Sequence, residues 1–175
     1  MPGAWFYSDS IDRLHHEQLE FLKTQQFRKP PTPKQEIEWL AEREVIDLAN
    51  NMGYRVTTTP HKSPFDLWIE GVKVEIKASA WHETTEKRRG SRYQANIRNY
   101  QFDILIFDCI NGRHHFHIIP MVEIIPRRHL AVWSYEPTES AGQWVRFLEQ
   151  WDFLEQAVDQ VNHRRYFKSW DGNRR

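Results

Sequence analysis

The sequence has very little cysteine, no excess of charge of either sign and no long hydrophobic run. Its single cysteine, Cys109, excludes an intramolecular disulfide and a cysteine-rich zinc site. The 24 Lys and Arg residues balance 24 Asp and Glu residues, so any positively charged surface must be local. The apolar runs are short, such as Ile104–Phe107, whereas a membrane span needs about 20 apolar residues. We therefore expect an intracellular, cytoplasmic protein with no membrane partner.

The 175 residues, 39% of them hydrophobic, are enough for one domain with its own core. The hydrophobic period changes from helical to strand-like after Gly53. The pattern predicts helices at 11–27, 34–52 and 141–161, a short helical turn at 120–125, and strands at 54–59, 65–70, 72–79, 92–98, 102–110, 113–119 and 130–135. Strands between helical ends predict an α+β fold, an α/β sandwich.

Three parts are expected along the chain. Residues 1–33 form an N-terminal helical arm with a proline-rich linker, because three prolines in four positions cannot continue a helix. Residues 34–162 form the main domain. Residues 163–175 form a basic tail that also carries aromatic side chains, which suits docking or base stacking as well as solvation.

One predicted hairpin places apolar side chains on one face. With Glu70 and Gly71 as a two-residue turn, antiparallel pairing puts Ile69 opposite Val72 and Leu67 opposite Val74. The same register extends to a contact between Phe65 and Ile76. A slip of one residue would turn one strand's side chains to the wrong face, so the apolar match supports this register.

The other face of this hairpin carries the candidate chemistry. Asp66 lies opposite Glu75 in this register, and Lys77 lies beside Glu75 on the same face. Two facing carboxylates repel each other and need a cation, which lysine or a divalent metal with oxygen ligands supplies. An ordinary amphipathic hairpin with surface ion pairs is the alternative interpretation.

The segment from Ala41 to Lys77 resembles the core of the PD-(D/E)xK nuclease superfamily. In order it has a glutamate on a helix, a strand, Asp66, and Glu75-Ile76-Lys77. Its Ala-Glu-Arg-Glu start and Gly-Tyr-Arg-Val exit are similar to archaeal Holliday-junction resolvases. The apolar pattern and aromatic placement of Arg92–Leu154 are similar to intron-associated homing endonucleases and restriction-like relatives. The resemblance implies a restriction-endonuclease-like core, a central mixed sheet flanked by helices.

The resemblance also implies a set of site residues. Glu42 becomes the helix carboxylate and Lys77 the catalytic lysine. Asp66, Glu75 and the carbonyl of Ile76 become ligands of Mg²⁺, for which Mn²⁺ is expected to substitute. Glu36 and Glu44 remain alternatives to Glu42, because one sequence does not set the phase of the helix. Phe65 separates Pro64 from Asp66, whereas the superfamily's name has Pro and Asp adjacent.

The implied activity is Mg²⁺-dependent hydrolysis of phosphodiester bonds in double-stranded DNA. A sequence-specific endonuclease of homing or restriction type is the first expectation, acting as a homodimer or larger assembly because each chain has one site. The alternatives are a Holliday-junction resolvase, which reads shape, and a DNA-binding module of the same fold without catalysis.

Two groups of polar residues are candidates for DNA contact. A basic run suits phosphates, and the polar face of the following strand suits base edges as well, although an ordinary exposed strand face is the alternative. The run comprises Lys87, Arg88 and Arg89, and the strand face comprises Arg92, Gln94, Asn96 and Arg98. A third polar group, His114, His115 and His117, has no cysteine nearby, so packed or surface histidines are expected there.

Overall fold

The computed structural model describes residues 32–60, 62–82, 90–139 and 142–172, with side chains up to 165. The predicted helix at 11–27 lies outside the described residues. So do Lys87, Arg88, Arg89 and the last three residues of the tail.

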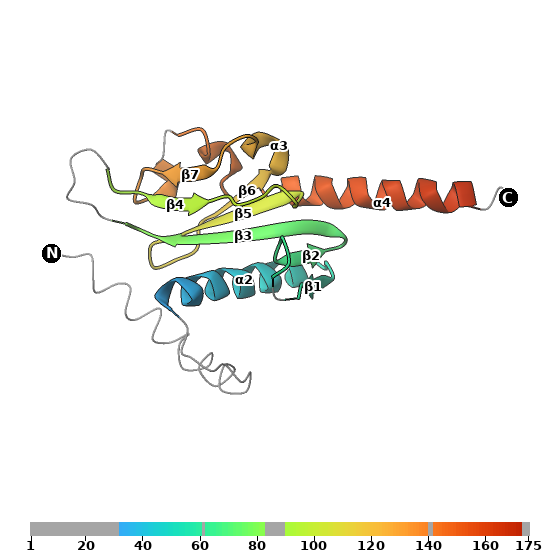
Figure 1. The fold of residues 1–175 in the computed structure, drawn as a ribbon, viewed down its shortest axis with the longest axis horizontal. Coiled ribbons are helices and arrows are strands. Elements are labelled where there is room, and N and C mark those ends of the chain that lie inside the picture. Colours follow the sequence, from blue (N-terminus) through green and yellow to red (C-terminus); the bar gives the residue numbers. More distant parts are fainter. Residues whose placement is uncertain (1–31, 61, 83–89, 140–141, 173–175) are drawn as a thin grey trace, which may run out of the picture.

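The described chain forms a five-stranded mixed sheet and a separate two-stranded ribbon (Figure 1). The strand order in the sheet is β1-β2-β3-β5-β6, in which β3 and β5 are parallel and the other pairs are antiparallel. The ribbon consists of β4 and β7, which are antiparallel. The strands are β1 (Val56–Thr58), β2 (Leu67–Ile69), β3 (Val72–Ala80), β4 (Tyr93–Asn96), β5 (Ile104–Ile110), β6 (Phe116–Pro120) and β7 (His129–Val132).

Helices cover the sheet and extend beyond it. They are α2 (Pro33–Asn51), α3 (Met121–Ile124) and α4 (Asp152–Gly172), with 3-10 turns at Pro137–Glu139 and Val145–Phe147. In Figure 1, α2 runs along β3, and the far half of α4 projects beyond the sheet. This arrangement is the α+β fold with a mixed sheet and flanking helices that the sequence predicts, so the fold class is confirmed.

The start of α2 is set by a capping box. The Thr32 side chain accepts a hydrogen bond from the backbone N–H of Gln35, and the Gln35 side chain accepts one from the N–H of Thr32 at 2.9 Å. Pro33 occupies the first turn, where its missing N–H costs nothing. Ala41 and Val45 are fully buried against the sheet, so the helix phase is fixed and with it the direction of every glutamate on α2.

Two hydrophobic cores lie on opposite faces of the sheet. Val72, Val74 and Ile76 of β3 pack with α2 and α4 in the first core. Alternate residues of β5, such as Leu105 and Phe107, pack with the β4–β7 ribbon in the second core. Side chains at odd positions of β3 therefore lie on the face that the ribbon shares.

Two details differ from the sequence-based expectations. The helical segment expected at 141–161, for which the sequence also allows a break, is interrupted: a 3-10 turn at Val145–Phe147 precedes α4, which begins at Asp152 and continues beyond the expected end to Gly172. Phe65 does not pair with Ile76, because β2 begins only at Leu67 and Phe65 is buried in the second core, whereas Ile76 is in the first. No helix among the described residues is long and apolar enough to cross a membrane.

Candidate active site

The β2–β3 hairpin has the register that the apolar pattern predicts. Leu67 pairs with Val74 and Ile69 pairs with Val72, around a turn in which Glu70 and Gly71 both have positive φ. Glycine suits such a turn because it has no Cβ. Regular pairing ends at Leu67, so β2 and β3 separate on the side where Asp66 lies.

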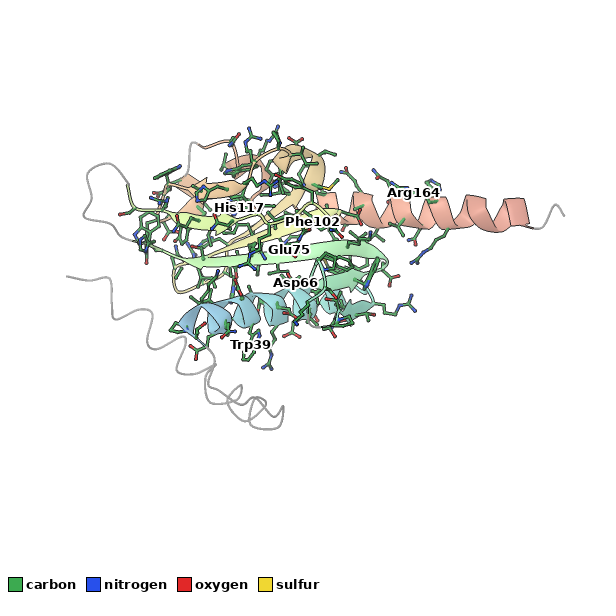
Figure 2. All side chains as sticks on the ribbon, viewed as in Figure 1. Trp39, Asp66, Glu75, Phe102, His117 and Arg164 are labelled. Atoms are coloured by element: carbon green, nitrogen blue, oxygen red, sulfur yellow. The ribbon has the colours of Figure 1, made fainter. Side chains whose placement is uncertain are left out.

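Asp66 fills the gap between the separating strands. Its backbone N–H donates to the carbonyl of Val74 at 3.0 Å, and its carboxylate Oδ2 accepts the N–H of Ile76 at 2.7 Å. The carboxylate thus takes the hydrogen bond that a paired strand would otherwise accept, which holds it beside the middle of β3. Figure 2 labels Asp66 beside β3, the strand that carries Glu75, and the Asp66 charge acts on Glu75.

Glu75 and Lys77 are joined directly on β3. The Lys77 ammonium forms an ion pair with Glu75 Oε1 and donates to the carbonyl of Ile76 at 3.3 Å. Burial raises the pKa of Glu75, the Lys77 charge opposes this shift, and the negative charges of Asp66 and then Glu38 add to it. The carboxylate of Glu75 therefore depends on a cation to remain ionised.

Glu42 of α2 belongs to the same electrostatic group. Burial, and then repulsion by Asp66, raises the pKa of Glu42 from 4.5 to about 7. Asp66 thus acts on both Glu42 and Glu75, so three carboxylates from a helix, a loop and a strand are coupled. These are the three acidic residues that the sequence singles out.

Helix phase separates the other glutamates of α2. Glu38 lies one helical turn before Glu42 and acts on Glu75, a contribution that the sequence analysis missed. The sequence does contain a signal for this residue: Glu38 precedes Glu42 by four residues, a spacing that places two side chains on the same side of a helix. Glu36 is two residues from Glu38, which turns it to another side of the helix. Glu44 instead acts on His114 at the far end of β5 and β6.

The oxygen atoms of this site suit a hard divalent cation. No three His, Cys, Asp or Glu side chains within the described part of the chain converge closely enough to hold a metal. The carbonyl of Ile76 supplies a further oxygen on the residue whose N–H Asp66 accepts, and Lys77 places a positive charge on that carbonyl and on Glu75. Two carboxylates and one carbonyl therefore form a donor set that fits Mg²⁺.

A cleft in the described structure lies elsewhere. It has a volume of about 600 Å³ and lies between the turn of the β2–β3 hairpin and α4, where Lys73 and Arg164 are among its lining residues. None of Glu42, Asp66, Glu75 and Lys77 lines it. An open site is expected for a polymeric substrate, which needs a surface more than an enclosed pocket.

The predicted strand face is partly exposed. Asn96 and Arg98 are exposed, and Arg92 and Gln94 are half-buried. The Arg92 Nε donates to Gln94 Oε1 at 3.0 Å, so these two side chains are held together. The face lies on β4 and its extensions, which adjoin β3: the Gln94 N–H donates to Ser79 Oγ at 3.1 Å.

The three histidines of the sequence motif are packed. His114 Nδ1 lies 2.5 Å from Oδ2 of the buried Asp108, which, together with the Asp108 charge, raises the pKa of His114 against the opposing effect of burial. His115 and His117 are buried, and burial lowers the pKa of His117 to about 4. The hydrogen-bond partners of His114 and His115 are Asp108, Asn111 and Arg113, none of which belongs to the candidate site.

Comparison with known proteins gives the fold. No family model and no curated protein matches the sequence. Among solved structures, the bacterial homing endonuclease I-Ssp6803I matches with a TM-score of 0.59 and 16% sequence identity, over 76% of this chain and 99% of that one. At this identity the match concerns the fold alone. The chain therefore shares the fold of that endonuclease, a mixed sheet flanked by helices, which is the restriction-endonuclease-like fold class that the sequence resemblance implied.

Proposed function

We propose that this protein is a Mg²⁺-dependent DNA endonuclease of homing or restriction type, which cuts double-stranded DNA at a specific sequence. The observation that carries the proposal is the position of Asp66, held by the Ile76 N–H beside the Glu75–Lys77 pair, in a fold that resembles a homing endonuclease. Two raised pKa values, those of Glu42 and Glu75, beside the fixed carboxylate of Asp66 are a pattern that occurs often at functional sites.

The proposed roles follow from these contacts. Asp66, Glu75 and the Ile76 carbonyl would hold Mg²⁺, and Mn²⁺ would substitute for it. When bound, the metal lowers the pKa of a water and offsets negative charge on the phosphate. Lys77 would leave the Ile76 carbonyl and orient the attacking water. Glu42, whose pKa of about 7 allows it to hold or release a proton near neutrality, would take part through water.

Cutting both strands at once needs two sites, and the described residues of one chain bring together one. We therefore propose a homodimer or larger assembly. Attack in line with the leaving oxygen would give a 5′-phosphate and a 3′-hydroxyl, as the superfamily resemblance implies.

The test compares two DNA substrates in Mg²⁺: a pool of long linear duplexes and an immobile four-way junction. The proposal predicts cuts at a defined duplex sequence and no preference for the junction. Cleavage of the junction alone would assign the chain to the resolvases. Binding to duplex without cleavage in Mg²⁺ or Mn²⁺ would contradict the enzyme and leave a DNA-binding module.

A further inference from the structure

The polar face of β4 does not stand alone, because β7 pairs with it. Gln94 faces Ala131 and Asn96 faces His129 in an antiparallel register. The register continues past both strands, since the Ile97 N–H donates to the Arg128 carbonyl at 2.9 Å. The ribbon is therefore a rigid two-stranded element rather than a single strand.

One face of this ribbon is buried and the other faces outward. Tyr93, Ala95, Leu130 and Val132 are buried in the second core. Residues between them in the alternation lie on the opposite face, where directly paired Cβ atoms are about 5 Å apart. This outer face consists of Gln94 and Ala131, Asn96 and His129, and, one step beyond the strands, Arg92 and Trp133.

The ends of the outer face are basic and its centre is neutral. The Arg92 guanidinium lies over the Trp133 ring at 5.2 Å. At the other end the exposed Arg98 is in step with Gln94 and Asn96 on the outer face. The exposed Arg128 is in step with the buried Leu130, but its guanidinium reaches Arg98 and donates to the Arg98 carbonyl at 3.4 Å. Positive charge at both ends with amide, methyl and imidazole groups between them complements a DNA groove, which has phosphates at its rims and base edges in its floor.

A two-stranded ribbon fits the major groove of B-DNA. In that groove glutamine pairs with the N6 and N7 atoms of adenine, and an alanine methyl contacts the thymine methyl. Arg92 holds Gln94 by its Oε1, which directs the amide nitrogen away from Arg92. Ala131 lies directly across from Gln94, so the two side chains suit the two bases of one A·T pair.

The ribbon is also held to the strand of the candidate site. His82, just after β3, exchanges two backbone hydrogen bonds of 3.0 Å with Arg92, just before β4. A base contact made by the ribbon therefore has a fixed offset from Glu75 and Lys77. A fixed offset is what an enzyme needs to cut at a set distance from the sequence that it reads.

From these contacts we propose that β7 supplies half of the base-reading surface: Ala131 contacts a thymine methyl beside Gln94 on the paired adenine, and His129 contacts the base edge next to Asn96. This inference rests on the proposed DNA endonuclease function and assigns its specificity to a ribbon rather than to β4 alone. His129 and Ala131 carry no sequence signal for this role.

The test selects bound duplexes from a randomised synthetic pool in Ca²⁺, with wild-type protein and with His129→Ala, Ala131→Gly and Gln156→Ala. Gln156 is exposed on α4 and serves as the matched control. His129→Ala is expected to lose about ten- to a hundredfold of base discrimination at one position and to keep its affinity for random DNA. Gln156→Ala is expected to select the wild-type sequence.

A second measurement examines the methyl contact directly. In the selected duplex, replacing each thymine in turn by deoxyuridine removes one methyl group. Wild-type binding is expected to weaken about fourfold at one thymine, the value of burying one methyl group, and Ala131→Gly is expected to be insensitive there. Circular dichroism and thermal unfolding of each variant verify that it is folded.

The outcomes distinguish a failure of this inference from a failure of the proposed endonuclease function. If the wild type selects no duplex sequence, both the sequence-specific function and the ribbon's role are overturned. If the wild type selects a sequence and folded His129→Ala and Ala131→Gly select it equally well, with the same response to deoxyuridine, the ribbon's role is overturned and the endonuclease proposal stands.

Discussion

The carboxylate of Asp66 accepts the backbone N–H of Ile76 at 2.7 Å, across the point where β2 and β3 separate. One carboxylate oxygen is thereby fixed beside the backbone whose carbonyl binds Lys77. The strand separation creates the site: with regular pairing, a neighbouring backbone carbonyl would take that N–H and Asp66 would be free to turn away. Because of this hydrogen bond, a substitution of Asp66 that tests its charge must keep an acceptor for the Ile76 N–H.

Asp66→Asn and Glu75→Gln are expected to abolish cleavage and to leave DNA binding in Ca²⁺ equal or tighter. Both variants remove one of two repelling charges, and asparagine keeps an acceptor for the Ile76 N–H, whereas alanine would leave that donor unpaired at a cost of about 1–3 kcal/mol. Cleavage and binding are measured on the same preparations. Asp47→Asn, an exposed carboxylate on α2, is the control and should cut normally.

Lys77→Ala is expected to lower the single-turnover cleavage rate by about 100-fold or more with little change in DNA affinity. The reason is that Lys77 touches Glu75 and the Ile76 carbonyl, so it acts where the water is positioned. Lys73→Ala, a lysine on the same face of β3, is the matched control and should retain the rate. An unchanged rate with weakened binding would make Lys77 a phosphate contact.

Glu42→Gln is expected to stabilise the metal-free protein at pH 8 and not at pH 4. The folded pKa of about 7 lies above the usual 4.5, so the proton that Glu42 retains stabilises the fold below pH 4.5, and this contribution is lost as the pH rises through 7. After allowance for solvent screening the gain at pH 8 is on the order of 1–2 kcal/mol. Urea unfolding at both pH values measures it. Equal stability of wild type and variant at pH 8 would contradict the raised pKa of Glu42, which burial and then Asp66 cause.

Much of this arrangement follows from local sequence patterns. The apolar alternation predicts the pairs Leu67–Val74 and Ile69–Val72, because a shifted register would expose them. The same alternation wrongly pairs Phe65 with Ile76. Alternation of apolar residues does not show where strand pairing ends, and Phe65, which lies before β2, packs in the second core instead.

Other parts depend on contacts distant in sequence. Helix phase, set by the burial of Ala41 and Val45, directs Glu38 toward Glu75, and the sequence alone does not give that phase. The partner of β4 is β7, some thirty residues later, and no local signal marks the pairing of Asn96 with His129. The side chain that lies opposite a given residue in the ribbon can therefore not be predicted from the local sequence.

Glu38→Gln is expected to raise the Mg²⁺ concentration needed for half-maximal cleavage by a few fold, and Glu36→Gln is expected to leave it unchanged. Glu38 adds negative potential at Glu75, whereas Glu36 points to another side of α2. A Mg²⁺ titration of the cleavage rate measures both. Equal effects of the two substitutions would show that only the net charge of the helix matters.

The salt dependence of DNA affinity tests which residues of this neutral chain contact phosphates. Arg88 and Arg89 together replaced by alanine should weaken binding to all sequences alike and reduce the salt slope by about two contacts. Gln94→Ala should relax the base preference and leave the slope unchanged, because a base edge releases no counterion. Binding in Ca²⁺ at several salt concentrations gives both quantities. A wild-type slope in the double variant would exclude the basic run Lys87–Arg89 as the main phosphate contact and favour the basic tail at 163–175.

The most direct test of the central claim is the chemistry of the cut ends. Wild type and Asp66→Asn are incubated with long genomic DNA, with Mg²⁺ or with a chelator, and all new ends are captured and sequenced. We predict ends at one shared sequence that carry 5′-phosphates, produced only by the wild type and only with Mg²⁺. Ends that appear equally with Asp66→Asn, or equally in the presence of chelator, would contradict a metal-dependent nuclease site at Asp66 and Glu75.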